Sequence, residues 1–340
     1  MTAYDALLVD LDGTVYRGPS PIDGAVESLA AARASATVSY VTNNASRGPD
    51  DVADHLRALG LTLDTDDVVT SAQAGAAVLA QHCAPGSAVL VVGTEALAEE
   101  IRRVGLVPVR SEDDGPVAVV QGHSPDTGWP ILAEAALALN RGAHWVACNV
   151  DPTLPQERGL LPGNGSMVAV LRTACEREPE VAGKPAAPLL AQAIARFDAR
   201  RPLVVGDRLD TDIAGAHSVG ADSLLVLTGV STAANVLAAP AGQRPTYLGA
   251  DLRVLGGGLA ATAVADGDTG GWTVHRDGGV LVLDADADAD ADADGDDADA
   301  VAALRALCRV AWGADEGWTE VRAAGARGEK VIGALGLATG

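Results

Sequence analysis

A short apolar run that ends in two aspartates constrains this 340-residue chain more than any other feature. Residues 7–9 predict a buried parallel strand, and the sequence DLDGT follows at 10–14. Parallel α/β sheets bind ligands outside the carboxyl ends of their strands, so the run delivers Asp10 and Asp12 to such a crevice. Strand alternation predicts that two residues spaced i, i+2 lie on the same side. Two neighbouring carboxylates repel each other unless a cation or a shared proton compensates, and Mg²⁺ suits carboxylates together with phosphate oxygens.

A second strand-like run, residues 37–41, ends in small hydroxyl and amide side chains. Thr42 and Asn43 come first, and a proline and two acids shortly afterwards predict the start of a helix. Hydroxyls, amides and the free N–H groups of a helix start suit an anion. Taken alone, the segment also fits an ordinary loop with side-chain capping.

Two later segments add charged residues that are candidates for the site. Lys184 is one of only two lysines in the chain and lies between a glycine and Pro185, which predicts a helix start. A further buried run ends in Gly206, and an acidic loop with Asp207 and Asp212 follows. Each segment by itself also fits a solvated loop or turn chemistry.

The four motifs together resemble the haloacid dehalogenase superfamily, whose order they follow: DxDGT at 10–14, Thr42, Lys184 and GDxxxTD at 206–212. The resemblance implies a Mg²⁺-dependent phosphatase in which Asp10 forms an aspartyl-phosphate and Asp12 is the general acid and base. It places Thr42, Asn43 and Lys184 on the phosphoryl group. The metal ligands that the resemblance implies are Asp10, Asp12, Asp207 and Asp212.

The element pattern predicts an α/β fold with a Rossmann-like, doubly wound parallel sheet. The hydrolase core is expected to be discontinuous, with residues 1–75 and 180–258. Residues 76–179 carry another set of alternating strands and helices. By resemblance to the nitrophenylphosphatase-like branch, they form an inserted C2-type cap that closes over a small substrate.

Substrate choice is indicated by the cap segment 148–166, which resembles the specificity segment of that branch. Leu154 and Pro155 stand where pyridoxal phosphatases have a His-Pro pair. This difference favours a phosphatase of the glycerol 3-phosphate or phosphoglycolate type. For the individual residues of this segment, an ordinary Pro/Gly loop explains the sequence as well as substrate contact does.

Residues 259–340 form a third segment that the phosphatase fold does not need. Residues 256–258 predict a hinge, 272–274 and 280–283 strands, and 301–310 a helix. With this segment the chain resembles actinobacterial glycerol 3-phosphate phosphatases, which carry a GNAT-like C-terminal domain. The sequence from Arg322 to Ala326 matches an acyl-CoA loop poorly, so packing or dimerisation is expected rather than acetyl transfer.

Composition excludes several classes of function. A net charge of −22 argues against a nucleic-acid partner and against docking on anionic membranes. The alternating Asp/Ala tract at 284–299 predicts a disordered linker. The apolar runs are too short to span a bilayer, and the first strand starts too early for a signal peptide, so a cytoplasmic protein is expected. Its four cysteines predict small buried hydrophobes, and its six histidines show no metal-ligand spacing.

Glycerol 3-phosphate is the expected substrate, with phosphoglycolate or broad specificity for nitrophenyl and sugar phosphates as the alternative. A phosphomutase also uses both aspartates of DxDGT, and a non-catalytic scaffold is an answer of another class. A homodimer is compatible with the sequence.

Overall fold

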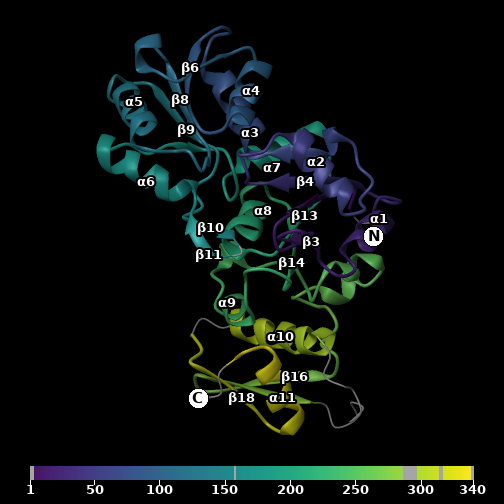
Figure 1. Ribbon diagram of the computed structural model, residues 1–340. Coiled ribbons are helices and arrows are strands. Elements are labelled where there is room, and N and C mark those ends of the chain that lie inside the picture. Colours follow the sequence, from purple (N-terminus) through teal and green to yellow (C-terminus); the bar gives the residue numbers. More distant parts are fainter. Residues whose placement is uncertain (1–3, 157, 286–296, 314–316, 338–340) are drawn as a thin grey trace. The chain divides into compact units, whose positions relative to one another are not determined.

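The computed structural model describes residues 4–156, 158–285, 297–313 and 317–337 (Figure 1). The chain divides into two compact units. Unit 1 comprises Met1–Val38 and Arg200–Gly340, and unit 2 comprises Ser39–Ala199. The finer division into core, cap and C-terminal module stays a prediction.

Unit 1 contains a parallel array of strands in the order β15-β14-β13-β1. All four residues of β1 are buried, as expected for a parallel strand that is covered on both faces. Strands β1 and β13 lie where the apolar run 7–9 and the buried run that ends in Gly206 predict strands. The strands are β1 (Ala6–Val9), β13 (Pro202–Gly206), β14 (Asp222–Val226) and β15 (Tyr247–Gly249), and the small hairpin is β2 (Tyr16–Arg17) and β3 (Ser20–Pro21).

The helical segments of unit 1 that precede residue 270 are short. Helix α1 begins at Ala25 after Gly24, a residue in the left-handed conformation with φ 73°. The acidic segment after β13, expected to be a loop, is a π-helical turn, η3. Leu209 and Ile213 of this turn are buried, so their packing against the core winds the segment. The helical segments are α1 (Ala25–Ala32), η3 (Leu209–Ile213), α8 (Ala214–Ser218), α9 (Ala233–Leu237), η4 (Ala241–Gln243), η5 (Leu252–Gly256) and η6 (Leu259–Thr262).

The C-terminal part of unit 1 is a three-stranded sheet with two helices. Strands β16 (Trp272–Asp277) and β17 (Val280–Ala285) pair antiparallel, and β17 pairs in parallel with β18 (Glu320–Ala323). Helix α10 (Asp297–Trp312) packs on β16 and β17, and α11 (Ala326–Ala334) packs on β18. One hydrophobic cluster joins these elements to η3, α9 and β15.

The ends of the Asp/Ala tract are ordered, which corrects the prediction of a disordered linker over 284–299. Asp284 and Ala285 complete β17, because the strand continues its pairing as far as Trp272 on β16. Helix α10 begins at Asp297, and acidic residues in a first helical turn are stabilised by the helix dipole. The rest of the tract, 286–296, lies outside the described residues.

Unit 2 carries a five-stranded parallel sheet in the order β12-β9-β8-β6-β7. Helices α5 and α6 cover one face, and α3 and α4 cover the other (Figure 1). The strands are β6 (Ala88–Val92), β7 (Val107–Val109), β8 (Ala118–Gln121), β9 (His144–Ala147) and β12 (Glu180–Val181), and the helices are α3 (Ser71–His82), α4 (Glu95–Arg103), α5 (Trp129–Asn140) and α6 (Asn164–Cys175).

The remaining elements of unit 2 lie next to Thr42, Lys184 and the predicted specificity segment 148–166 in the sequence. Strand β4 (Thr37–Thr42) crosses the boundary between the units and pairs in parallel with β5 (Val68–Thr70), and α2 (Pro49–Ala58) follows it. The specificity segment contains an antiparallel hairpin, β10 (Thr153–Gln156) with β11 (Gly159–Pro162), rather than a plain loop. Helix α7 (Ala187–Arg196) begins with Pro188 in its first turn, so Pro185 does not start it as expected.

The parallel sheets and their helices confirm the predicted α/β fold class. Cys148 and Cys308 are buried as expected, and burial raises the pKa of the Cys148 thiol to about 12. Cys83 and Cys175 are only half-buried. In the part of the chain that the structure describes, no helix combines the length and hydropathy needed to cross a membrane.

Candidate active site

Unit 1 brings three of the predicted carboxylates together. Asp10 follows β1, Asp207 follows the neighbouring strand β13, and Asp212 lies in η3. The Asp10 N–H donates to the Val205 carbonyl at 2.8 Å, so the parallel pairing holds both strand ends in register. One carboxylate oxygen from each aspartate lies within 4.8 Å of the others.

The surroundings hold Asp207 and Asp212 in fixed positions. Both side chains are almost completely buried. The Val230 N–H donates to Asp207 Oδ2 at 2.6 Å, and the Arg208 N–H donates to Asp212 Oδ2 at 3.1 Å. These backbone donors orient the carboxylates before any ligand binds.

The donor set fits Mg²⁺. Magnesium prefers hard oxygen ligands and is bound in proteins by a few carboxylates plus water or phosphate oxygens. Three buried or half-buried carboxylates this close together also need a compensating positive charge. The residues that would hold the ion are therefore Asp10, Asp207 and Asp212.

Glycines make room for this cluster. A Cβ added to Gly229 would overlap the Asp207 carboxylate, and one added to Gly206 would overlap Asp212. Gly13, with φ 87°, would place a Cβ 2.6 Å from Asp207 Oδ2. Gly206 of the fourth motif, Gly13 of the first motif and Gly229 are thus required by their close approach to the Asp207 and Asp212 carboxylates.

We expect Gly229→Ala to lower the affinity for Mg²⁺ by at least about tenfold, because the added methyl displaces the Asp207 carboxylate. Titration calorimetry with MgCl₂ measures this affinity directly. Gly242→Ala is the matched control, since a Cβ there meets open space. Equal Mg²⁺ affinity in both variants would show that Asp207 is not held as described.

Asp12 lies outside the group of three carboxylates. Its side chain is exposed, and the Tyr16 hydroxyl donates to Asp12 Oδ2 at 3.4 Å. Strand β1 ends at Val9, so strand alternation does not extend to Asp12. Its expected roles as a metal ligand and as the general acid and base stay predictions.

Unit 2 brings the other three predicted residues together. Thr42 ends β4 and is buried, and its hydroxyl accepts the Asn44 N–H at 3.0 Å. Lys184 is buried and donates from Nζ to the Val41 carbonyl at 3.2 Å. A cationic side chain is therefore held at the carboxyl end of β4.

Asn43 positions the backbone of Lys184. Its Oδ1 accepts the Lys184 N–H at 2.8 Å, and its Nδ2 donates to the Lys184 carbonyl at 3.0 Å. The same Nδ2 donates to Asp151 Oδ2 at 3.1 Å, and Asn149 Nδ2 donates to the Asn43 carbonyl at 2.7 Å. These bonds link the residues that follow β4, β9 and β12. They also engage the Asn43 amide, which the resemblance placed on the phosphoryl group.

Sequence reasoning missed the roles of Asn149, Asp151 and the Val230 N–H. Asn149 and Asp151 follow the carboxyl end of β9, so the rule that located Asp10 could also have located them. It also missed the grouping of His82, His144 and Glu180, because these residues are far apart in the sequence.

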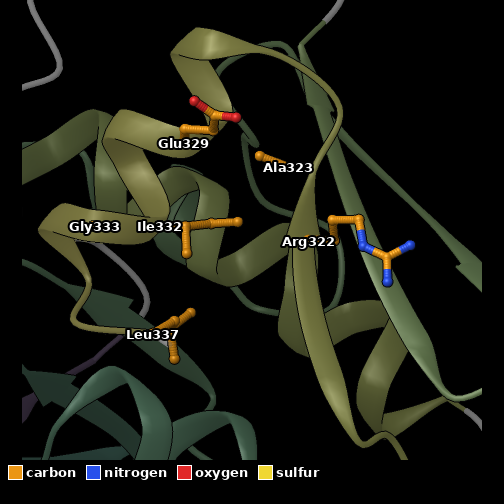
Figure 2. A pocket seen from close by; sticks show the side chains of 6 residues that line it. All are labelled: Arg322, Ala323, Glu329, Ile332, Gly333 and Leu337. Atoms are coloured by element: carbon orange, nitrogen blue, oxygen red, sulfur yellow. The ribbon is translucent and has the colours of Figure 1, made fainter. Parts of the chain in front are cut away.

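A cavity of about 340 Å³ lies in the C-terminal part of unit 1, between β18 and α11 (Figure 2). It is lined by one cationic, one anionic and several apolar or small residues: Arg322, Ala323, Glu329, Ile332, Gly333 and Leu337. Arg322 pairs with Glu320, two residues away on the same strand.

Comparison with known proteins identifies the class. Residues 7–107 match the family of haloacid dehalogenase-like hydrolases, and residues 181–255 match a second family description of the same kind. The chain belongs to the haloacid dehalogenase-like hydrolases, which confirms the resemblance that its motifs carry.

A relative from Mycobacterium tuberculosis, named D-glycerol 3-phosphate phosphatase, is 57% identical over 282 residues, covering 83% of this chain and 79% of the relative. The crystal structure of a glycerol phosphate phosphatase from the same organism in complex with magnesium has a TM-score of 0.91 and 50% identity, and covers 99% of this chain and 98% of that one. A p-nitrophenyl phosphatase from Archaeoglobus fulgidus has a TM-score of 0.68 and 29% identity, covering 74% and 97%.

Proposed function

We propose that this haloacid dehalogenase-like phosphatase hydrolyses glycerol 3-phosphate with Mg²⁺ as its cofactor. The observation that carries the proposal is the cluster of Asp10, Asp207 and Asp212 at the carboxyl ends of two parallel strands. The likeness to D-glycerol 3-phosphate phosphatase and to a magnesium complex supports both the substrate and the metal.

In this mechanism Asp10 attacks phosphorus, and the bond between phosphorus and the glycerol oxygen breaks. Asp12 gives its proton to the departing oxygen, and the aspartyl-phosphate remains on Asp10. Asp12 then takes a proton from water, which attacks phosphorus; the bond between phosphorus and the Asp10 oxygen breaks, and inorganic phosphate is released. When bound, Mg²⁺ would offset the negative charge on the phosphoryl oxygens.

Thr42 and Lys184 are proposed to act on the phosphoryl group. A hydroxyl donor and a compact ammonium charge stabilise the oxygens of a phosphoryl group in transfer. Asn43 is proposed to serve them as a positioning residue, because its amide is engaged with the Lys184 backbone and with Asp151.

We expect Asn43→Ala to lower kcat for glycerol 3-phosphate roughly 100-fold, because a small displacement of Lys184 misplaces its charge. Steady-state kinetics separate this from substrate binding, since a direct phosphate ligand would raise KM as well. Asn140→Ala, an exposed asparagine at the end of α5, is the control. An unchanged kcat in Asn43→Ala would remove the positioning role.

A panel of phosphomonoesters tests the substrate. Phosphate release with Mg²⁺ is measured on glycerol 3-phosphate, phosphoglycolate, pyridoxal phosphate and p-nitrophenyl phosphate. A preference for the first that EDTA abolishes supports the proposal. Equal slow turnover of all four would replace it with a broad-specificity phosphatase, and release from none would favour a phosphomutase or a scaffold.

A cytoplasmic location and a homodimer stay predictions, as does the inserted cap over the substrate. Sedimentation of the purified protein measures the number of copies. Fractionation of the native host measures the location.

A further inference from the structure

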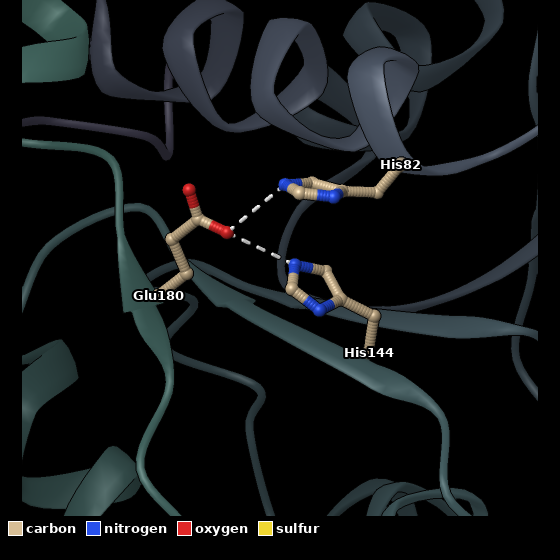
Figure 3. A group of neighbouring side chains, drawn as sticks. All are labelled: His82, His144 and Glu180. Atoms are coloured by element: carbon tan, nitrogen blue, oxygen red, sulfur yellow. Dashed lines mark hydrogen bonds and ion pairs between the residues drawn. The ribbon is translucent and has the colours of Figure 1, made fainter.

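Two histidines and a glutamate of unit 2 converge outside the predicted active-site residues (Figure 3). His82 Nε2 lies 3.3 Å and His144 Nε2 lies 3.1 Å from the same oxygen, Glu180 Oε2. The two ring centroids are 4.5 Å apart, with an angle of 38° between the ring planes. Both imidazoles therefore present the same nitrogen toward one carboxylate oxygen.

The backbone fixes this convergence. His82 ends α3, His144 begins β9 and Glu180 begins β12. Glu180 pairs with Val146, so His144, two residues earlier on β9, projects from the same face of the sheet. Helix α3 packs on β9 and brings His82 to that face. Ligands held by the ends of regular elements keep their geometry better than ligands on loops.

The spacing matches that of ligands around a zinc ion. Zinc binds imidazole nitrogens and carboxylate oxygens at about 2.0 Å in a tetrahedral arrangement, which places neighbouring ligand atoms about 3.3 Å apart. The two nitrogen–oxygen distances, 3.3 and 3.1 Å, lie close to this value. Two histidines and one glutamate leave a fourth position for water, and the three side chains are exposed enough for an ion to enter.

We propose that His82, His144 and Glu180 form a binding site for a divalent transition metal of the zinc type. Nitrogen donors select such ions over Mg²⁺, which prefers the oxygen cluster of Asp10, Asp207 and Asp212. The ion would tie α3, β9 and β12 together and stabilise unit 2.

The site is separate from the residues proposed to act on phosphate. His144 and Glu180 begin β9 and β12, whereas Asn149, which donates to the Asn43 carbonyl, and Lys184 follow the carboxyl ends of these two strands. Strand β9 has four residues, so its two ends lie roughly 10 Å apart. Loss of the metal is therefore expected to change stability rather than the chemistry at Asp10.

Equilibrium dialysis of the full chain against micromolar Zn²⁺ in millimolar Mg²⁺ tests the proposal, with bound zinc measured by mass spectrometry. The excess Mg²⁺ competes for the aspartate cluster. We expect His144→Gln and Glu180→Gln to weaken zinc binding at least tenfold. His275→Gln, an exposed histidine on β16, is the matched control and should bind zinc like the unchanged chain.

Thermal melting provides the second readout. Zinc should raise the melting temperature of the unchanged chain and of His275→Gln, and it should not raise that of Glu180→Gln. Melting without zinc shows that each variant folds. Zinc binding and stabilisation that are the same in all four proteins would overturn the proposal, whatever the outcome of the phosphatase assay.

Discussion

Asp10→Asn is expected to release phosphate from glycerol 3-phosphate at least about 10⁴-fold more slowly than the unchanged chain. The amide cannot attack phosphorus, so the covalent step is lost rather than slowed. The substitution also removes one negative charge from the cluster with Asp207 and Asp212. The variant should therefore fold, since it relieves repulsion among three neighbouring carboxylates.

The measurement is single-turnover phosphate release at saturating Mg²⁺, with the melting temperature recorded for the same sample. Asp23→Asn is the matched control in unit 1, because Asp23 is exposed and pairs only at the surface with Arg253. It should keep full activity. Activity in Asp10→Asn within tenfold of the unchanged chain would exclude Asp10 as the nucleophile.

Arg305→Ala is expected to destabilise unit 1 by roughly 3–5 kcal/mol. Arg305 lies in the middle of α10 and is buried. Its guanidinium donates to the Leu248 carbonyl at 3.0 Å and twice to the Asp268 carbonyl, at 3.1 and 2.9 Å. Burial lowers the pKa of this guanidinium, and the hydrogen bonds offset the cost of burying its charge.

Removal of the side chain leaves two carbonyls without these donors and opens a space beside them. Urea unfolding measured by circular dichroism gives the change in the free energy of unfolding. Arg322→Ala is the control, because Arg322 is exposed and pairs with a neighbour on its own strand. Its expected effect is below about 0.5 kcal/mol, and a similar small effect for Arg305→Ala would contradict the packing described.

The strands that deliver the site were predictable from the sequence because they are short, wholly apolar and followed at once by polar residues. The apolar run 7–9 lies in β1, and the buried run that ends in Gly206 forms β13. Their ends place Asp10 and Asp207 together, as the rule for parallel sheets requires.

The remaining features depend on contacts between distant residues. The segment 209–213 carries turn-like acids, and only its packing through Leu209 and Ile213 makes it helical. Asn43 looked like a phosphate ligand because nothing in the sequence shows that the Lys184 backbone lies beside it. The histidines at 82 and 144 meet only because α3 folds back on β9.

The hydrophobic cluster of unit 1 should determine which elements of this unit unfold together. Leu209 and Ile213, which flank Asp212, belong to the same cluster as Leu304 and Leu307 of α10. Detachment of α10 would therefore open the cluster to which the turn with Asp212 belongs. Backbone amides of η3 and α10 should exchange their hydrogens with solvent deuterium at a common rate under conditions of local opening, as members of one cooperative unit do. A metal bound by Asp212 would then slow exchange in α10, although no residue of that helix is among the ligands.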